Sequence, residues 1–452
     1  MNQPASAARE APDPAQGDGP DPMALMRQRA FIVLLVLAAV VGVIAAVAAF
    51  GFLELLSQMK PWVYTDLPDA LGFDSTPDWW ALPVLVIAGL LSALAIVRLP
   101  GIGGHIPAHG LNAAPTEPIE LPGVIVAALA AIGLGVVLGP EAPLIAMGGA
   151  LGFLVIRIVR PDAPPEAQAL IAAAGTFSAV SFLFGSPLIA AVILIEAAGI
   201  GGPRLPLVLI PGLLAAGIGS LVSIGMGSWT GVDTSEISIG VLALPDFARP
   251  DFGDFAWTIA LAAAIALLVF VIFTIGRRVV PLATARPFLV LPAVGVAVAV
   301  LAIIFSQAAN KGVDQVLYSG QDAIGPLVSN PGAWSTAALL GVLACKGLAY
   351  ALSLGSFRGG PVFPALFLGA AAGVLVADLP DFGLTPAVAV GVGAATVAVL
   401  RLPLSAVVLA FVLTSQSGPG AAPLIIVGVV VAYLVTLALP SPPPPEPAPK
   451  PA

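Results

Sequence analysis

The sequence predicts an all-α, polytopic membrane protein built from two related halves of opposite orientation. Of its 452 residues, 59% are hydrophobic and 9% are charged, whereas soluble globular proteins carry about 25% charged residues. A chain this apolar cannot cover its surface with polar side chains, so lipid is its expected solvent. Motifs that recur at a nearly constant spacing, and an alternation of acidic loops with basic helix ends, predict the two halves.

Seven apolar segments in each half are expected to form helices. A spanning helix needs about 20 apolar residues, and several of these segments are shorter and are interrupted by Gly or Pro. Short, broken apolar segments at matching positions of two halves indicate a binding site near the midplane of the bilayer. The segments are 30–55, 82–97, 124–138, 144–159, 170–184, 188–200 and 205–224, then 255–275, 288–305, 333–354, 362–376, 387–400, 404–414 and 424–439.

Polar stretches divide the chain into five parts. Residues 1–28 are polar and rich in Pro, Ala and Asp, which predicts a disordered cytoplasmic tail. The membrane repeats are expected at 29–226 and 255–439, separated by an acidic extracellular loop at 227–254. Residues 440–452 form a proline-rich tail, also expected in the cytoplasm.

The charges at the helix ends predict the orientation in the cell membrane. Arg27 and Arg29 precede the first helix, and Arg277 and Arg278 end the first helix of the second half. The loop that follows the first helix of the first half and the loop that precedes the first helix of the second half are both acidic. The positive-inside rule places the N-terminus in the cytoplasm and the acidic loops outside. The first helix of each half then starts on opposite sides, which is an inverted topology.

Two pairs of motifs support the internal repeat. GPEAP at 139–143 and GPVFP at 360–364 are offset by 221 residues, and both run into glycine-containing apolar helices. Pro-Leu at 187–188 and at 403–404 are offset by 216 residues. The alternative is that Gly-, Pro- and Ala-rich membrane segments resemble one another through composition alone.

Glu141 is the most informative residue of the sequence. A carboxylate within an apolar membrane segment is costly and indicates function by default. Pro143 suits the first turn of a helix, which puts Glu141 at a helix start, where free N–H groups and the helix dipole favour negative charge. A chloride ion would compete for the same place, so Glu141 can act as a tethered plug that protonation releases. The alternative is a capping glutamate near the interface.

These motifs, in this order, resemble those of the chloride channel (CLC) family. GPEAP resembles the family's G-(K/R)-E-G-P motif, GGHIP at 103–107 its GSGIP stretch, and 360–364 its GxFxP motif; 186–188 and 401–404 resemble two further family helices. The resemblance implies a CLC-like inverted repeat of many tilted and partial helices, in a divergent bacterial-type member without CBS domains. It also implies a homodimer with an anion path in each subunit, gated by Glu141.

The same resemblance implies an anion-binding set at three helix starts. Small inorganic anions, chloride foremost, are the expected transported ions, and no cofactor or nucleic-acid partner is expected. The residues implied are Gly103, Gly104, His105, Ile106, Pro107, Gly139, Ala142, Gly360, Val362 and Phe363.

The chain departs from the family pattern within this set. The family's chloride-coordinating serine falls on Gly104, beside which the ring of His105 is either a replacement donor or a structural group. The GxFxP phenylalanine falls on Val362, with Phe363 one place on. Pro361 removes a backbone N–H from the second helix start. The family's central tyrosine lies on a final helix whose place the proline-rich tail takes here.

The internal proton-transfer glutamate of family antiporters falls on Ala197, with Glu196 just before it as the candidate for a proton path. Uncoupled, channel-like conduction is therefore slightly favoured over proton/chloride exchange. Lys346 and Arg358 are embedded charges, and Arg358 is placed to steer anions.

Two readings from other classes remain open. The first is a secondary transporter of another fold and substrate. The second is an intramembrane metalloenzyme using His105 and His109, which have helical ligand spacing but no third ligand nearby. The single Cys345 adds no metal cage, and a transporter that is not an enzyme is expected.

Overall fold

The computed structural model describes residues 23, 26–110, 116–199, 202, 205–232 and 238–440. Nearly all of the two expected tails lies outside these ranges. Within them, the secondary structure consists of helices and loops, with one isolated bridge between two extended residues. Nine helices of the described part are long and apolar enough to cross a membrane, as the composition predicted. The chain is a polytopic all-α membrane protein.

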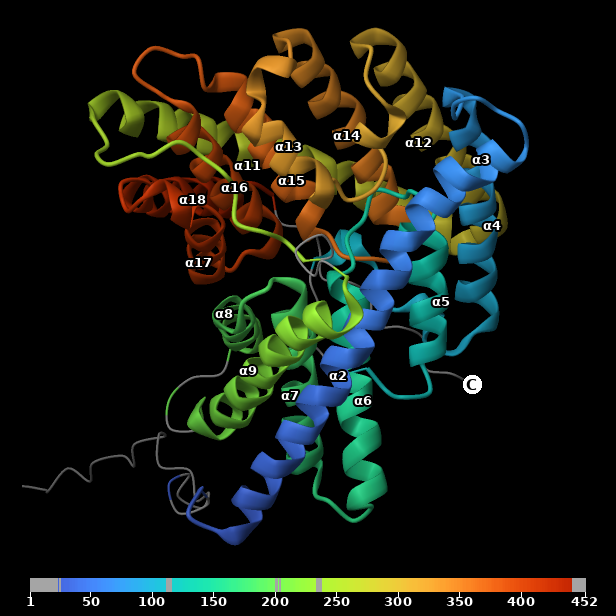
Figure 1. The fold of residues 1–452 in the computed structure, drawn as a ribbon, viewed down its shortest axis with the longest axis vertical. Coiled ribbons are helices and arrows are strands. Elements are labelled where there is room, and N and C mark those ends of the chain that lie inside the picture. The colour runs from blue at the N-terminus through green and yellow to red at the C-terminus, as the bar shows by residue number, and fades with distance from the viewer. Residues whose placement is uncertain are drawn as a thin grey trace, which may run out of the picture.

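Two sets of helices form the two repeats (Figure 1). The first set is α2 (Arg29–Pro61), α3 (Leu67–Ala70), α4 (Ala81–Arg98), α5 (Leu121–Ile132), α6 (Glu141–Val159), α7 (Pro165–Leu183), α8 (Pro187–Ala198) and α9 (Leu205–Thr230). The second set is α11 (Phe252–Ala285), α12 (Pro287–Ala309), α13 (Gln321–Ser329), α14 (Thr336–Ser356), α15 (Val362–Val376), α16 (Leu384–Leu400), α17 (Pro403–Leu413) and α18 (Ala421–Ala438).

Packing is the same in both repeats. Helix α6 packs along α7 as α15 packs along α16, and the trio α2, α7 and α9 is matched by α11, α16 and α18. Glycines permit these close contacts: a Cβ added to Gly148 would overlap the carbonyl of Gly175, and one added to Gly369 would overlap that of Gly391. The two glycine pairs are related by the offsets of the sequence motifs. The internal repeat is therefore present in the structure as well as in the sequence.

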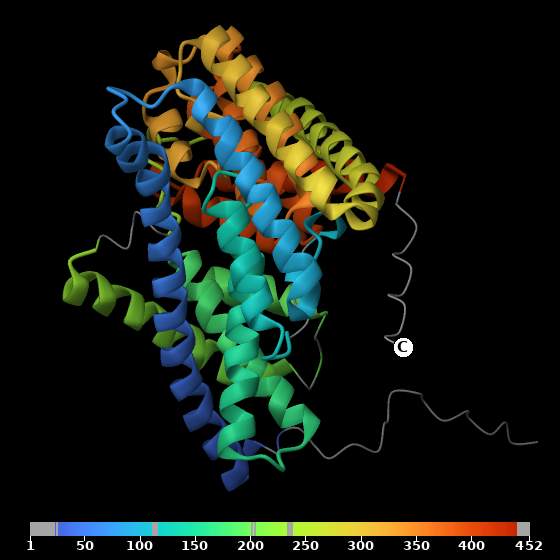
Figure 2. The same ribbon diagram turned by 90° about the vertical axis from the view of Figure 1, so that its right-hand side faces the viewer.

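Helices from different repeats also pack on each other. Helix α4 lies along α12, light blue and yellow in Figure 2, where a Cβ on Gly89 would overlap the backbone of Pro292. Helix α8 of the first repeat also packs on α17 of the second. At the centre, Gly139 and Gly360 form an antiparallel bridge, with the Gly139 N–H donating to the Gly360 carbonyl at 2.8 Å. Each glycine thus pairs with its own counterpart in the other repeat, as a two-fold relation between the repeats requires.

Burial separates the inner helices from the outer ones. Every residue from Thr385 to Leu400 of α16 is buried, and so is every residue from Val362 to Val374 of α15. Helix α2, by contrast, exposes large apolar side chains such as Ile32 and Val36 along one side. A helix that is apolar all round belongs in a core or in lipid. The short helices near the bridge are thus enclosed by protein.

Several helix bounds differ from the expected ones. Helix α5 ends at Ile132 rather than at 138, because Gly135 adopts a left-handed φ of 104° that stops the helix. Helix α2 continues to Pro61, and helical turns follow to Ala70, so part of the acidic stretch between the first two expected segments, 30–55 and 82–97, is helical. Helix α9 runs on to Thr230. Helix α13 was not expected, since its nine residues carry too few apolar side chains to be read as a membrane segment.

Candidate functional site

The carboxylate of Glu141 lies at the centre of the molecule. Glu141 is the first residue of α6 and is 2% exposed. Its Oε1 accepts a hydrogen bond from the backbone N–H of Phe363 at 2.7 Å. Its Oε2 is buried and has no hydrogen-bond partner among the described residues. The side chain therefore starts at one repeat and caps the helix start of the other.

Two glycines make room for this carboxylate. A Cβ on Gly360 would overlap Oε2 of Glu141, and a Cβ on Gly139 would overlap the same oxygen. These are the two residues of the central bridge. The bridge between the repeats and the seat of the carboxylate are therefore one structure.

The start of α15 keeps its first-turn donors. Pro361 is the N-cap of α15, so its missing N–H lies ahead of the helix, and Val362 and Phe363 follow with theirs. The Phe363 ring is fully buried and stacks on Phe184 with centroids 5.7 Å apart. The Tyr350 hydroxyl donates to the carbonyl of Pro361, a contact that no motif in the sequence predicts. Pro361 therefore does not take an N–H donor from the first turn of α15, contrary to the expectation from the sequence.

Two cavities are lined by the residues that flank Glu141 in the chain. One, of about 630 Å³, is lined by Pro140, Ile239, Tyr318, Lys60 and other residues, and is called the Tyr318 cavity below. The other, of about 260 Å³, includes Ala142 and Arg358 in its wall and is called the Arg358 cavity. Both cavities therefore reach the backbone next to Glu141.

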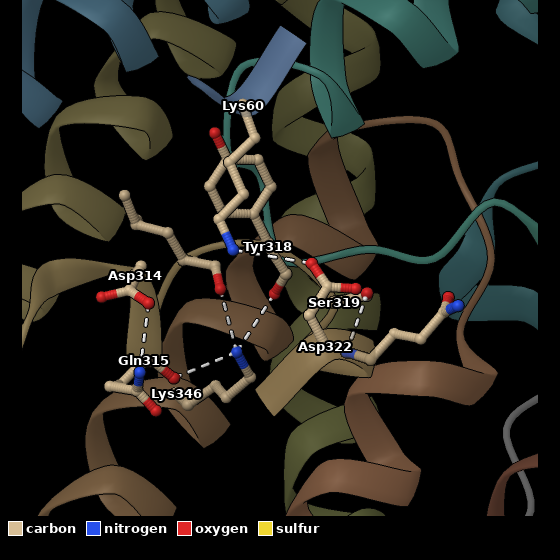
Figure 3. Close-up of polar contacts among 9 residues, drawn as sticks. Lys60, Asp314, Gln315, Tyr318, Ser319, Asp322 and Lys346 are labelled. Carbon is tan, nitrogen blue, oxygen red and sulfur yellow. Dashed lines mark hydrogen bonds and ion pairs between the residues drawn. The ribbon is translucent and has the colours of Figure 1, made fainter. Parts of the chain in front are cut away.

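Lys346 holds the wall of the Tyr318 cavity (Figure 3). Its side chain is fully buried, and Nζ donates to four successive backbone carbonyls, those of residues 315–318, at 3.0–3.2 Å. It also lies 4.7 Å from the centre of the Phe367 ring. In the described part of the chain Lys346 has no carboxylate within ion-pair distance. This ammonium group fixes a loop; it neither reaches the surface nor faces a cavity.

A lysine and an aspartate meet at the edge of the same cavity. Nζ of Lys60 lies 3.5 Å from the Asp322 carboxylate and 5.3 Å from the centre of the Tyr318 ring. Both side chains are substantially exposed. The pair therefore joins α2 to α13 across the rim of the Tyr318 cavity.

The segment 103–107 lies on the other side, at the Arg358 cavity. Gly104 has a φ of 98°, and a Cβ added to it would lie 3.3 Å from Val124, so a residue with a side chain is disfavoured there. His105 donates from Nε2 to the Gly110 carbonyl at 3.0 Å. Burial, together with nearby positive charges, lowers the pKa of His105, which favours the neutral ring, in which Nδ1 is an acceptor. In that state His105 has no free ring N–H with which to replace the serine hydroxyl.

The rest of the implied set is divided by position. Gly103 and Ala142 line the Arg358 cavity with Gly104 and His105. Ile106 and Pro107 continue past that wall, where Pro107 is buried. The remaining members of the set, Gly139, Gly360, Val362 and Phe363, surround the Glu141 carboxylate.

Glu196 makes a different set of contacts. It lies in the last turn of α8, and its carboxylate accepts from the N–H groups of Leu404 and Ser405 at 3.0 and 2.7 Å and from the Ser405 hydroxyl at 2.6 Å. These donors begin α17. Glu196 therefore caps the helix that corresponds to its own in the other repeat, while Ala197 is exposed.

The two histidines do not form a ligand pair. Their ring centres lie 6.1 Å apart, and Nε2 of His105 is bonded to a carbonyl. Among the residues that the structure describes, no three His, Cys, Asp or Glu side chains gather as a metal site would require.

Comparison with known proteins places the chain among ion transporters. Residues 101–437 match a family model described as voltage gated chloride channel. The putative ion-transport protein YfeO of Escherichia coli O139:H28 (strain E24377A / ETEC) is 29% identical over 366 residues, covering 78% of this chain and 81% of the relative. YfeO of Escherichia fergusonii is 28% identical over the same length and shares.

Solved structures share the fold. A slow cyanobacterial Cl⁻/H⁺ antiporter matches with a TM-score of 0.70 and 21% identity, over 90% of this chain and 94% of the other. A CLC-type fluoride/proton antiporter matches with a TM-score of 0.66 and 16% identity, over 90% and 95%. The family model covers well over half of the chain. The chain is therefore a multi-pass membrane protein of the voltage gated chloride channel (CLC) family, whose function is anion transport.

Proposed function

We propose that the protein exchanges small anions such as chloride for protons, along a path that the carboxylate of Glu141 closes. The observation that carries the proposal is the position of Glu141. Its carboxylate is buried, its two chain neighbours line two different cavities, and it is hydrogen-bonded through one oxygen only. A negative group in that place occupies the seat that a transported anion needs.

The seat is suited to negative charge in general. The Phe363 N–H points to it from the first turn of α15, where the free donors and the helix dipole attract anions. An arriving anion therefore competes with the carboxylate for the same donor. A protonated Glu141 has lost its charge and can leave the seat, so proton uptake by Glu141 opens the seat to an anion and couples the two movements.

This proposal favours exchange, whereas the alanine at position 197 had favoured channel-like conduction. Both similar solved structures are named as antiporters, one of chloride and one of fluoride, and this supports exchange. The Tyr318 cavity extends to Pro140, which offers water, and hence protons, an approach to Glu141 from one side. The proton route on the other side does not pass through a carboxylate at position 197.

Vesicles that contain the purified full-length protein test the proposal. A chloride gradient is imposed, the membrane potential is clamped with a potassium ionophore, and the internal pH is recorded. We expect protons to move opposite to chloride, even against their own gradient, and we expect the Glu141→Ala protein to move chloride without protons. Chloride flux without proton movement in the native protein would leave uncoupled conduction, and absence of both fluxes would reject anion transport by this chain.

The family resemblance further supports a homodimer with one path in each subunit, and cytoplasmic ends of the chain. Light-scattering mass of the protein in detergent tests the assembly. Labelling of cysteines introduced near residue 26 and near residue 440, from one side of the membrane at a time, tests the orientation.

A further inference from the structure

Arg358 is a buried charge without a carboxylate partner. It lies between α14 and α15 and is 7% exposed. Neither of the ion pairs found in the described ranges involves it. A buried charge is strongly unfavourable unless it is paired or well hydrogen-bonded, so the surroundings of this guanidinium group call for an explanation.

Backbone carbonyls orient the guanidinium group without using all of it. Nε donates to the carbonyl of Ile102 at 3.2 Å, and Nη1 donates to the carbonyls of Phe357 and Ser356 at 3.3 and 3.5 Å. The stem is held as well, because a Cβ on Gly103 would lie 3.2 Å from Cγ of Arg358. Nη2 has no hydrogen bond to the described residues. The guanidinium group is thus fixed in direction, and the N–H groups of Nη2 are spare.

Arg358 lines a cavity with other features that suit an anion. Ala142 and Pro143, in the first turn of α6, form part of the same wall; Pro143 has no N–H, but the N–H of Ala142 and the partial positive charge of the helix start favour an anion there. Glu120 is the one carboxylate in that wall, and it forms no ion pair with Arg358 within 4.0 Å. Gly104 contributes no hydroxyl.

We propose that Arg358 binds the transported anion in this cavity, next to the seat of Glu141, and that its planar fork makes small planar oxyanions such as nitrate better ligands than halides. The inference rests on the proposed anion transport and adds the group that selects the ion. Arginine donates two parallel hydrogen bonds to a planar oxyanion, whereas a spherical halide receives a single-point contact. The guanidinium group takes over the role for which Gly104 lacks a side chain.

Three variants of the full-length protein test the assignment. Arg358→Gln removes the charge, Arg358→Lys keeps the charge without the fork, and Arg98→Gln removes a matched charge from an exposed position at the end of α4. Equilibrium titration with sodium nitrate and sodium chloride in detergent gives the two affinities, and flux of each anion from vesicles gives half-saturation and maximal rate. Size-exclusion profiles confirm that each variant is folded.

Native protein is expected to bind nitrate more tightly than chloride. Arg358→Gln is expected to weaken both by roughly 10- to 100-fold, as for the loss of a hydrogen bond to a charged group. Arg358→Lys is expected to keep chloride affinity within about threefold while the nitrate preference is lost, because a point charge cannot make the paired contact. Arg98→Gln is expected to match the native protein.

An unchanged nitrate-to-chloride ratio in Arg358→Lys overturns the proposal, as does unchanged affinity in folded Arg358→Gln or the absence of binding in the native protein. If Arg358→Gln does not fold, the ratio in Arg358→Lys decides alone. A purely structural role predicts lower stability with the ratio preserved. Equilibrium binding does not depend on proton coupling, so failure of exchange and failure of this assignment give different results.

Discussion

The carboxylate of Glu141 accepts a hydrogen bond from the N–H of Phe363 at 2.7 Å, and so joins the first residue of α6 to the second residue of α15. The counterpart of Glu141 in the second repeat, at the 221-residue offset, is the apolar Val362. The two repeats therefore share a backbone frame but not a chemistry. The first provides a titratable group, and the second provides its donor.

Glu141→Gln should remove the pH response of anion flux. The amide oxygen can still accept from Phe363, but the side chain no longer carries a charge that protonation removes. Native flux is expected to rise as pH falls, because a protonated carboxyl group leaves the seat, whereas Glu141→Gln should show the same flux throughout. Flux from vesicles between pH 4.5 and pH 8 measures both profiles.

The control for this experiment is Glu54→Gln, which changes a partly exposed glutamate of α2 whose carboxylate accepts from the Gln58 side chain. Its profile should follow that of the native protein. A pH response that persists unchanged in Glu141→Gln would reject the tethered plug.

Gly360→Ala should displace the carboxylate from its seat. A Cβ at Gly360 would overlap Oε2 of Glu141, and the neighbouring bridge to Gly139 prevents the backbone from yielding. Flux in this variant should lose its pH response while Glu141 is still present. Gly217→Ala is the matched control, since a Cβ there meets nothing within 4 Å and should leave flux unchanged. Normal pH dependence in folded Gly360→Ala would show that the seat tolerates the added methyl group.

The sequence was sufficient to predict the fold because the signals are local and repeated. Apolar runs long enough for membrane helices, and motifs at nearly constant offsets, can be recognised in the sequence without knowledge of the tertiary structure. Glu141 was recognised for a similar reason: a carboxylate within an apolar run is rare enough to be noticed alone. The positions of Gly139 and Gly360 followed from the offset, but their pairing with each other did not.

The contacts that define the site depend on tertiary structure. Glu141 was expected to interact with the start of its own helix, and its observed donor lies 222 residues away. No sequence pattern in residues 315–318 predicts that their carbonyls accept hydrogen bonds from Lys346. His105 was a plausible donor until its Nε2 was seen bonded to Gly110. Each of these contacts joins segments whose approach sequence periodicity does not encode.

Lys346→Met should destabilise the protein strongly. The substitution keeps the apolar stem but leaves the four carbonyls of residues 315–318 without their donor, and each buried unsatisfied polar group costs about 1–3 kcal/mol. Even partial compensation by water predicts a loss of several kcal/mol. Thermal unfolding in detergent, followed by intrinsic fluorescence, measures the change.

Lys60→Met provides the comparison. Its ion pair with Asp322 is exposed, and exposed pairs contribute about 0–1 kcal/mol. The midpoint temperature of thermal unfolding should therefore fall much further for Lys346→Met than for Lys60→Met. Equal shifts in the two variants would show that the carbonyls around Lys346 find other partners.

Glu196→Ala should lower stability without altering the number of protons exchanged per anion. Its carboxylate caps α17 from a neighbouring helix, and loss of a helix cap costs about 0.5–2 kcal/mol. Ser186→Ala is the natural control, because the Ser186 hydroxyl caps α8, the counterpart of α17. Both variants should shift the unfolding midpoint by similar amounts.

Glu196→Gln separates a cap from a proton carrier. The amide keeps one acceptor oxygen for the start of α17 but cannot exchange protons near neutral pH. If Glu196 only caps the helix, this variant should transport protons and chloride in the native ratio, and Ser186→Ala should do the same. A proton-to-chloride ratio that falls in Glu196→Gln and Glu196→Ala, but not in Ser186→Ala, would instead assign Glu196 to the proton path, since the loss would follow the titratable group rather than the stability of the helix.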